Sequence, residues 1–409
     1  MKKYIFFVVG VMCTLLSHTA YAIDLNKSDA NIIGHVLEKK TGEHLPYMTV
    51  ALKGTTIGTM TDGTGHYFLK NLPEGEFILS VSAVGYKPQE RKVTLKRGKT
   101  LEENFELEED MVALDGVVVT ANRNETARRL APTLVKVVTP KLFDMTNSHT
   151  LSQGLVFQPG VRVENDCQNC GYSQVRINGM DGKYTQILID SRPIFSALAG
   201  VYGLEQIPAN MIERVEVVRG GGSALFGSSA IAGTVNIITK EPLRNSGSFA
   251  HSISNFDGSG SFDNNTTLNL SLVSSDNKMG AYIYGQNRHR SAWDSNGDGF
   301  SELPKLKNQT VGVNAYYRLS PYSKLNLEYH HMEEFRRGGN RFDLPPHIAE
   351  DANLNGSGEP GLVEQIEHSI NTGGLKFSAF SKDQKHAFNA YASAQHIVRD
   401  SYYSAYGHT

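Results

Sequence analysis

A run of oxygen-bearing side chains between Asp294 and Glu302 has the spacing of a calcium loop. Carboxylate and amide oxygens stand at alternate positions, and Gly299 follows where an EF-hand loop needs its sharp turn. The twelfth position is Lys305 instead of the bidentate Glu, which predicts a weak site. An ordinary polar turn is the alternative. The expected Ca²⁺ ligands are the side chains of Asp294, Asn296, Asp298 and Glu302 and the carbonyl of Phe300.

Cys167 and Cys170 are a second group of residues that could do chemistry, as a disulfide, a redox site or a metal site. Residues 1–22 have the charged, apolar and small-residue regions of a signal peptide, so the exported chain meets an oxidising compartment. The flanking polar and glycine residues indicate a loop, whereas a redox pair needs a helix start and zinc needs further ligands. We expect a disulfide, with free thiols or a metal or redox site as alternatives.

Two patterns that resemble enzyme motifs lack the residues that would complete them. His35 and Glu38 spell the H-x-x-E of a zinc carboxypeptidase, but three positions apart on a strand they point to opposite faces. Gly222 and Gly227 have phosphate-loop spacing, but Ser228 stands where the lysine belongs. No nucleophile–base motif appears either. We therefore predict that the protein is not an enzyme.

The composition limits the class of protein further. The 409 residues hold 40 Lys and Arg against 42 Asp and Glu, so a dedicated nucleic-acid partner is not expected. Beyond the signal peptide no apolar run reaches the roughly 18 residues that a spanning helix needs. A membrane-spanning part would therefore have to be a β-barrel.

Residues 31–108 are expected to form a small antiparallel β-sandwich of about seven strands. Short β-rich runs alternate there with turn sequences such as Thr61–Gly65 and Pro73–Gly75. The run from Ile33 to Tyr86 resembles the carboxypeptidase-regulatory-like domain. The resemblance implies a compact module ahead of the rest of the chain.

Residues 113–121 are short, β-branched and bounded by polar sequence. An ordinary strand would have this composition, and so would a segment that adds to the edge of a partner's sheet. In its position after the first module, the run resembles the TonB box of TonB-dependent outer-membrane receptors. The resemblance implies that TonB binds Leu114, Asp115, Gly116, Val117, Val118, Val119, Thr120 and Ala121.

Residues 125–240 resemble the plug domain of these receptors, specifically the branch that takes up cobalamin, siderophores and haem. The ordered motifs that carry the resemblance are Pro159–Val161, Val175–Met180, Ile187–Asp190, Pro208–Gly220 and Ala230–Thr239. Apolar and charged residues alternate from Ile212 to Val217, which predicts one dry strand face and one polar face. The expected polar contacts to a barrel wall are Arg176, Glu213, Arg214, Glu216 and Arg219, with scattered surface charge as the alternative.

Residues 244–409 alternate apolar and polar positions along strands of about ten residues, as outer-membrane barrels do. Val311, Val313 and Leu319 share one face, and the next residues along the chain share the other. We expect about seven strands, with short turns at one end and long loops at the other. Large plugged transporters have about 22 strands, so we expect the N-terminal part of a longer receptor, either truncated or partial.

The expected fold is mostly β: a sandwich, an α+β plug and the first strands of a large antiparallel transmembrane barrel. The resemblance implies a TonB-dependent receptor in the outer membrane of a Gram-negative bacterium. Such a receptor contacts membrane lipid and TonB, and it imports a scarce nutrient such as an iron chelate, haem or cobalamin. The alternatives are a glycan importer with a surface lipoprotein partner, and a non-transporting sensor or adhesin. His330 and His331 suggest haem, but at most one can face the lumen.

Overall fold

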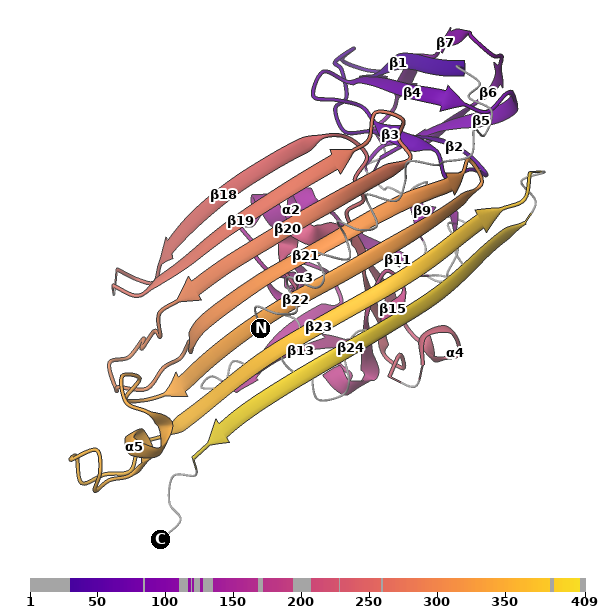
Figure 1. Cartoon of the computed structure of the whole chain (residues 1–409). Coiled ribbons are helices and arrows are strands. Elements are labelled where there is room, and N and C mark those ends of the chain that lie inside the picture. The colour runs from indigo at the N-terminus through magenta and orange to yellow at the C-terminus, as the bar shows by residue number, and fades with distance from the viewer. Residues whose placement is uncertain are drawn as a thin grey trace.

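The computed structural model describes residues 30–83, 85–109, 117–118, 120, 126–127, 135–167, 172–193, 207–227, 229–258, 260–382 and 386–404. The architecture is mostly β, as expected. An N-terminal β domain, a mixed plug region and a seven-stranded antiparallel sheet follow one another along the chain (Figure 1). Within the described ranges, no helix is both long enough and apolar enough to cross a membrane.

Two four-stranded sheets form the N-terminal domain. The first contains β1 (Ala30–Glu38), β4 (His66–Leu72), β7 (Thr100–Glu102) and β8 (Phe105–Leu107). The second contains β2 (Thr49–Leu52), β3 (Gly58–Met60), β5 (Gly75–Ser82) and β6 (Gln89–Leu95). Alternate residues of both sheets are fully buried between them, including Ile32, Val50, Leu69 and Leu79. Burial of these apolar faces holds the module together.

The expectation of about seven antiparallel strands was wrong in one respect. The domain has eight described strands, and β1 pairs in parallel with both β7 and β8. The chain crosses from β6 to the other sheet through a turn and meets β1 at its beginning, where Asn31 pairs with Thr100. Gly34 lies against the irregular residues between β7 and β8, since an added Cβ would lie 1.8 Å from the Glu103 carbonyl oxygen. A side chain there would separate β1 from its neighbours.

The plug region is built on a five-stranded sheet in the order β11-β16-β17-β14-β15. Its strands are β11 (Val135–Val138), β14 (Thr185–Ile189), β15 (Arg192–Pro193), β16 (Ile212–Arg219) and β17 (Gly233–Thr239). A hairpin of β12 (Val161–Cys167) and β13 (Tyr172–Ile177) packs beside it, with α2 (Pro140–Met145), α3 (Leu151–Leu155), α4 (Ser223–Phe226) and the short 3-10 turns η2 (Gly182–Tyr184) and η4 (Ala209–Met211). Leu151, Ile177, Val215 and Ile237 are buried at its centre.

Seven long strands follow in chain order, each antiparallel to the next. They are β18 (Ser246–Asn255), β19 (Phe262–Val273), β20 (Met279–Arg290), β21 (Lys305–Ser320), β22 (Ser323–Gly339), β23 (Val363–Phe380) and β24 (Ala387–Tyr403). The connections alternate between short turns and long loops, as the sequence predicted, and the longest loop contains α5 (Pro346–Glu350). The N-terminal domain lies at the short-turn end of the sheet (Figure 1). The contacts between them include the Thr56 N–H, which donates to the Pro321 carbonyl at 2.8 Å, and the Arg244 guanidinium, which lies 4.4 Å from the Tyr47 ring centre.

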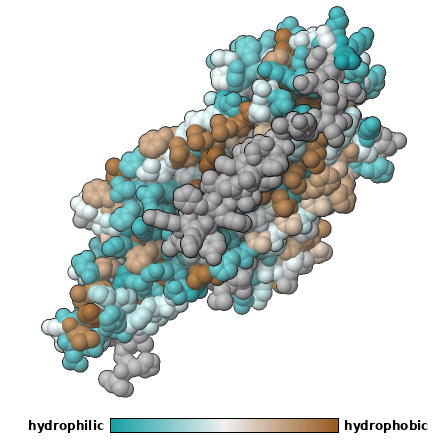
Figure 2. Space-filling view, viewed as in Figure 1, coloured by the Kyte–Doolittle hydropathy of each residue, from teal (hydrophilic) through white to brown (hydrophobic). Residues whose placement is uncertain are grey.

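The two faces of this sheet differ as the alternation predicted. Leu268, Leu272 and Val311 are exposed on one face, where an outer-membrane barrel meets lipid. Tyr282 and Tyr284 point the other way and are buried against the apolar core of the plug region. Hydrophobic surface is visible over the strands, and the N-terminal domain is mainly hydrophilic (Figure 2).

Candidate functional site

The segment that resembles a TonB box is described at three residues. Val117 and Val118 form the strand β9 (Val117–Val118), which pairs antiparallel with β10 (Thr126–Ala127). Thr120, the third, is buried. The remaining predicted TonB-binding residues, Leu114, Asp115, Gly116, Val119 and Ala121, lie outside the described residues. Their role stays a prediction.

Thr120 is attached to β16 and β17, two interior strands of the plug sheet. Its backbone N–H and its hydroxyl both donate to Glu216 Oε2, at 2.9 and 2.5 Å. The side-chain amide of Asn236 donates to the Thr120 hydroxyl oxygen at 3.0 Å, and Arg214 Nε donates to Glu216 Oε1 at 2.8 Å. Glu216 is fully buried, and a buried carboxylate needs such charge-assisted donors. The geometry therefore ties the segment to the plug at Thr120.

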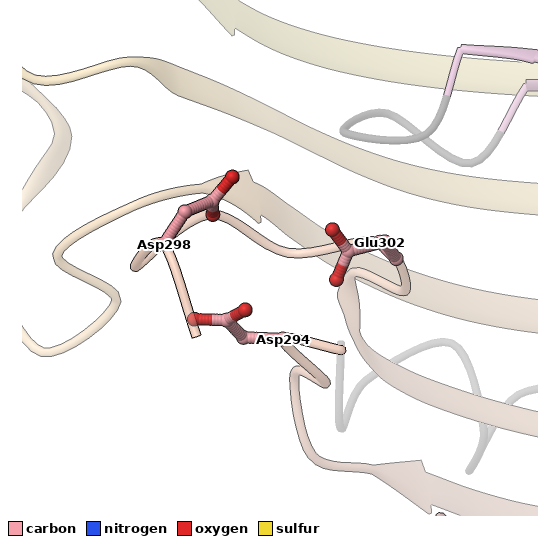
Figure 3. Close-up of side chains that lie close together, drawn as sticks. All are labelled: Asp294, Asp298 and Glu302. Atoms are coloured by element: carbon pink, nitrogen blue, oxygen red, sulfur yellow. The ribbon is translucent and has the colours of Figure 1, made fainter. Parts of the chain in front are cut away.

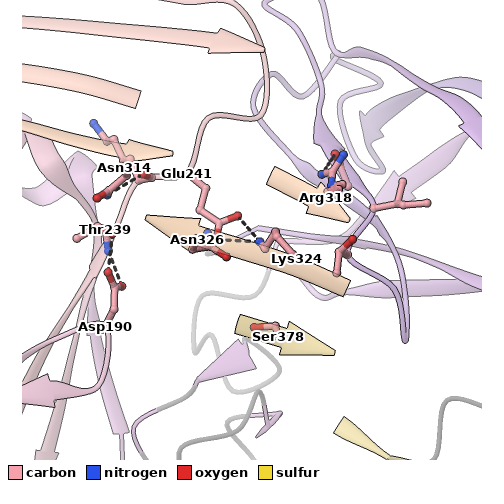
Figure 4. Close-up of polar contacts among 12 residues, drawn as sticks. Asp190, Thr239, Glu241, Asn314, Arg318, Lys324, Asn326 and Ser378 are labelled. Atoms are coloured by element: carbon pink, nitrogen blue, oxygen red, sulfur yellow. Dashed lines mark hydrogen bonds and ion pairs between the residues drawn. The ribbon is translucent and has the colours of Figure 1, made fainter. Parts of the chain in front are cut away.

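A tight turn between β14 and β15 extends this polar centre. Asp190 and Ser191 have φ values of 46° and 68°, the left-handed pair that a two-residue hairpin turn requires. The Asp190 carboxylate accepts from the Thr239 N–H and hydroxyl at 3.1 and 2.7 Å (Figure 4). Asn236 Oδ1 accepts from the Ser191 N–H at 2.9 Å. These bonds fix the turn and so aim the next residue, Arg192, at the seven-stranded sheet.

Arg192 forms an ion pair with Glu328 of β22, and both side chains are mostly buried. The arrangement depends on Gly374 of the neighbouring strand β23. An added Cβ there would lie 2.3 Å from the Arg192 guanidinium and 2.5 Å from the Glu328 carboxylate. The Arg192–Glu328 ion pair therefore joins the plug to the seven-stranded sheet in a space that Gly374 leaves open.

Other polar contacts join the same two parts. Glu241 pairs with Lys324 at 3.1 Å, and the Lys324 ammonium holds the pKa of Glu241 below its usual value (Figure 4). Asn210 donates to Asn269 Oδ1 at 2.9 Å and accepts at its carbonyl from the Tyr282 hydroxyl at 2.8 Å. Water can replace every one of these bonds, so separating the surfaces costs less than separating an apolar interface.

The five residues predicted to touch the barrel wall lie as follows. Arg176 pairs with Glu164 inside the β12–β13 hairpin, and Arg214 pairs with Glu216. The Arg219 guanidinium packs against Gly160. Glu213 lies near Lys240. Burial lowers the pKa of Lys240, and the Glu213 carboxylate acts in the opposite direction because it favours the charged ammonium. Contact of these five with the barrel wall stays a prediction.

Sequence reasoning missed Arg192, Asn210 and Glu241 as plug–sheet contacts. Each is a single polar residue at a turn or linker, and no local pattern marks its partner. The only available signal was the position of Arg192 directly after the Asp190–Ser191 turn.

The predicted disulfide falls partly outside the described residues. Cys167 ends β12, but its side chain and Cys170 are not described. The disulfide therefore stays a prediction.

Three carboxylates of the predicted calcium loop lie together. Asp294, Asp298 and Glu302 each offer an oxygen within 4.8 Å of the others, and the group could hold a metal ion (Figure 3). The loop is already closed by backbone donors, because Asp294 accepts from the Gly297 and Gly299 N–H groups at 2.7 Å each. Those two bonds stabilise the Asp294 carboxylate through backbone donors alone.

Comparisons with known proteins identify the family. Residues 32–119 match the CarboxypepD_reg-like domain, and residues 127–234 match the TonB-dependent Receptor Plug Domain. The chain belongs to the TonB-dependent receptor family. This match confirms the family resemblance inferred from the sequence. It also confirms the expected location of the protein in the outer membrane. The match to this receptor family bears out the prediction that the protein is not an enzyme.

Several relatives of this receptor are vitamin B12 transporters. The chain is 35% identical over 229 residues to BtuB of Vibrio vulnificus (strain YJ016), covering 49% of this chain and 37% of the relative. It is 37% identical over 128 residues to BtuB of Photobacterium profundum, covering 31% and 20%. The chain thus spans well under half the length of these relatives. The unliganded ferric citrate transporter FecA shares the fold, with a TM-score of 0.53, 16% identity and coverage of 66% of this chain and 40% of FecA.

Proposed function

We propose that this receptor imports a scarce nutrient across the outer membrane with energy supplied by TonB. The observation that carries the proposal is the attachment of Thr120 to Glu216. TonB would add a strand to the segment at 114–121 and pull it. Because Thr120 is bonded to β16 inside the plug sheet, the pull would act directly on the plug.

The polar plug–sheet contacts support a plug that moves. Arg192–Glu328, Glu241–Lys324 and the Asn210 bonds exchange for water when the plug shifts. The remaining resistance comes from the apolar contact of Tyr282 and Tyr284 with the plug core. The seven strands pair with one another, so a shift of the plug would not have to break their ladder.

Cobalamin is the nutrient we propose first, because the relatives named above are vitamin B12 transporters. Ferric chelates and haem are the alternative nutrients that we propose for this receptor. For haem, His330 offers little support, since its Nδ1 already lies 3.0 Å from the Tyr284 hydroxyl in the interior. A surface lipoprotein partner would instead favour a glycan.

The acidic loop is proposed as a Ca²⁺ site that orders the region between β20 and β21. Asp294, Asp298 and Glu302 supply hard oxygen ligands, with the Asn296 amide and the Phe300 carbonyl as further donors. The predicted affinity is low, at roughly 0.1–1 mM.

Uptake in cells that lack their own receptors tests the transport proposal. The receptor is expressed from its native gene with or without functional TonB, and cells are given labelled cyanocobalamin, a ferric siderophore or haemin in turn. We expect accumulation of one nutrient only when TonB is present. Accumulation that is equal with and without TonB, or absent for every compound of this class while the receptor is folded in the membrane, would contradict the proposal. Deleting residues 113–121 without a change in phenotype would favour a sensor or adhesin.

A further inference from the structure

Three histidine rings that the transport proposal does not use lie in mutual contact on the N-terminal domain. His35 lies on β1, His66 begins β4 directly opposite it, and His44 reaches them from the loop after β1. The ring centres are 5.3 Å apart for His35 and His44, 5.7 Å for His35 and His66, and 4.8 Å for His44 and His66. His44 and His66 are exposed and His35 is half-buried, so an ion in solution can reach all three.

We propose that these three imidazoles bind a divalent transition-metal ion of the class that prefers nitrogen ligands, such as Zn²⁺ or Cu²⁺. Imidazole is a common ligand for this class. Two imidazoles on one tetrahedral ion, each with a nitrogen roughly 2.0–2.1 Å from it, place their ring centres about 5 Å apart. All three separations in the cluster are close to that value.

The His66 ring is held in the orientation that a metal ligand needs. Its Nδ1 lies 3.0 Å from the Thr64 carbonyl oxygen, which can only accept a hydrogen bond. Nδ1 therefore carries the proton and Nε2 presents its lone pair to solvent. A carbonyl that fixes the far nitrogen in this way is the usual outer partner of a metal-binding histidine.

The turn that carries Thr64 is itself rigid. Asp62 Oδ1 accepts from the Thr64 N–H at 2.8 Å, from the Thr64 hydroxyl at 2.6 Å and from the His66 N–H at 3.1 Å. Gly65 has a φ of 77°, and an added Cβ would lie 2.8 Å from the His44 Cβ. A glycine here is what leaves room for the third histidine.

The site is completed by a small side-chain movement. The His44 and His66 rings are stacked at an interplanar angle of 27°, so their nitrogens do not yet face a common centre. Among the described residues, only the acidic loop already has its ligand atoms within 4.8 Å of one another. Rotation of the exposed His44 ring brings its nitrogen toward the ion at a modest cost in side-chain entropy.

Zinc titration of the untagged receptor tests this site independently of transport. Isothermal titration calorimetry compares wild type with His44→Ala, His66→Ala and the double variant. Both side chains are exposed, so the variants keep the core of the domain, which circular dichroism verifies. We expect the zinc affinity to fall about tenfold or more in each single variant, and one bound equivalent to disappear in the double variant.

Two matched controls separate this site from others. The double variant His251→Ala, His347→Ala removes exposed histidines elsewhere, and Asp298→Asn weakens the acidic loop; both should keep the histidine-dependent equivalent. Electron paramagnetic resonance with Cu²⁺ should show coupling to several nitrogens in wild type and lose it in the His44, His66 double variant. Equal zinc binding by wild type and that double variant, or a copper signal without multiple nitrogens, would overturn the proposal.

Discussion

The backbone N–H and the hydroxyl of Thr120 donate to the same carboxylate oxygen of Glu216, although 96 residues separate the two in sequence. This one oxygen links the segment that resembles a TonB box to β16, an interior strand of the plug sheet. Because Glu216 also holds Arg214, a pull on Thr120 reaches β16 through a network of hydrogen bonds. The link is therefore where force would enter the plug.

Replacing Glu216 with Ala should free Thr120 and destabilise the plug. The partly exposed Arg214 and the Thr120 donors lose their acceptor, which we expect to cost about 1–3 kcal/mol. Hydrogen exchange of the Thr120 amide should become faster, and proteases should cleave more readily near residues 113–121. Glu213→Ala on the same strand is the control and should leave the Thr120 amide protected. Unchanged protection in Glu216→Ala would show that the bond does not anchor the segment.

The Arg192–Glu328 ion pair should couple the plug to the strands. A double-mutant cycle with Arg192→Ala and Glu328→Ala, followed by urea unfolding of the receptor in detergent, should give a coupling energy of about 1.5–3 kcal/mol, as expected for hydrogen bonds to charged groups. The exposed Lys39–Glu108 pair serves as the comparison and should couple by less than about 1 kcal/mol. Equal coupling in the two cycles would mean that Arg192–Glu328 is no stronger than a surface pair.

Acid should remove the contribution of Glu108 to the N-terminal domain. Hydrogen bonds from Lys39 and Lys87 lower the pKa of Glu108 to about 2, from an ordinary 4.5. A lowered pKa in the folded state means that the stabilisation is complete above about pH 4.5 and is lost as the pH falls toward 2. Glu108→Gln should thus lower the melting temperature at neutral pH and match wild type near pH 2. A difference that does not change across this range would refute the assignment, and added salt should shrink the neutral-pH difference, because the side chain is partly exposed.

Calcium should protect the loop between β20 and β21 from proteolysis. Asp298→Asn removes charge but keeps an oxygen for the Phe300 N–H bond, whereas Asp294→Asn also gives up one of its two backbone N–H bonds. The affinity for Ca²⁺ should fall in both variants. Half-protection of wild type is expected at roughly 0.1–1 mM Ca²⁺. Asp257→Asn, in the loop between β18 and β19, is the control. Equal protection of wild type and both loop variants would exclude the site.

Periodic features of this chain could be predicted from its sequence. The alternation around Val311 correctly assigned the two faces of β21, and short and long connections fell where turn residues gather. The parallel pairing of β1 with β7 and β8 could not be predicted, because a three-residue strand has no measurable period. A short strand takes its direction from the path of the chain around it.

The candidate site could be predicted only in part, because its contacts join residues that lie far apart in the sequence. Glu216 was expected to face a barrel wall because charge alternates along β16. The structure places it in contact with Thr120, and nothing local to either residue indicates that pairing. Likewise, Arg192 and Glu328 lie far apart in the sequence, and the glycine that makes room for them, Gly374, lies on a third segment. Contacts of this kind depend on how distant elements pack.

Uptake by a Val118→Pro variant tests most directly whether TonB drives this receptor through the segment at 114–121. Proline removes the N–H of Val118 and blocks strand addition, while Val118→Ala preserves the backbone donor. The account predicts that Val118→Pro binds nutrient at the cell surface as wild type does but accumulates none inside, whereas Val118→Ala accumulates it. Normal uptake by Val118→Pro would contradict the account.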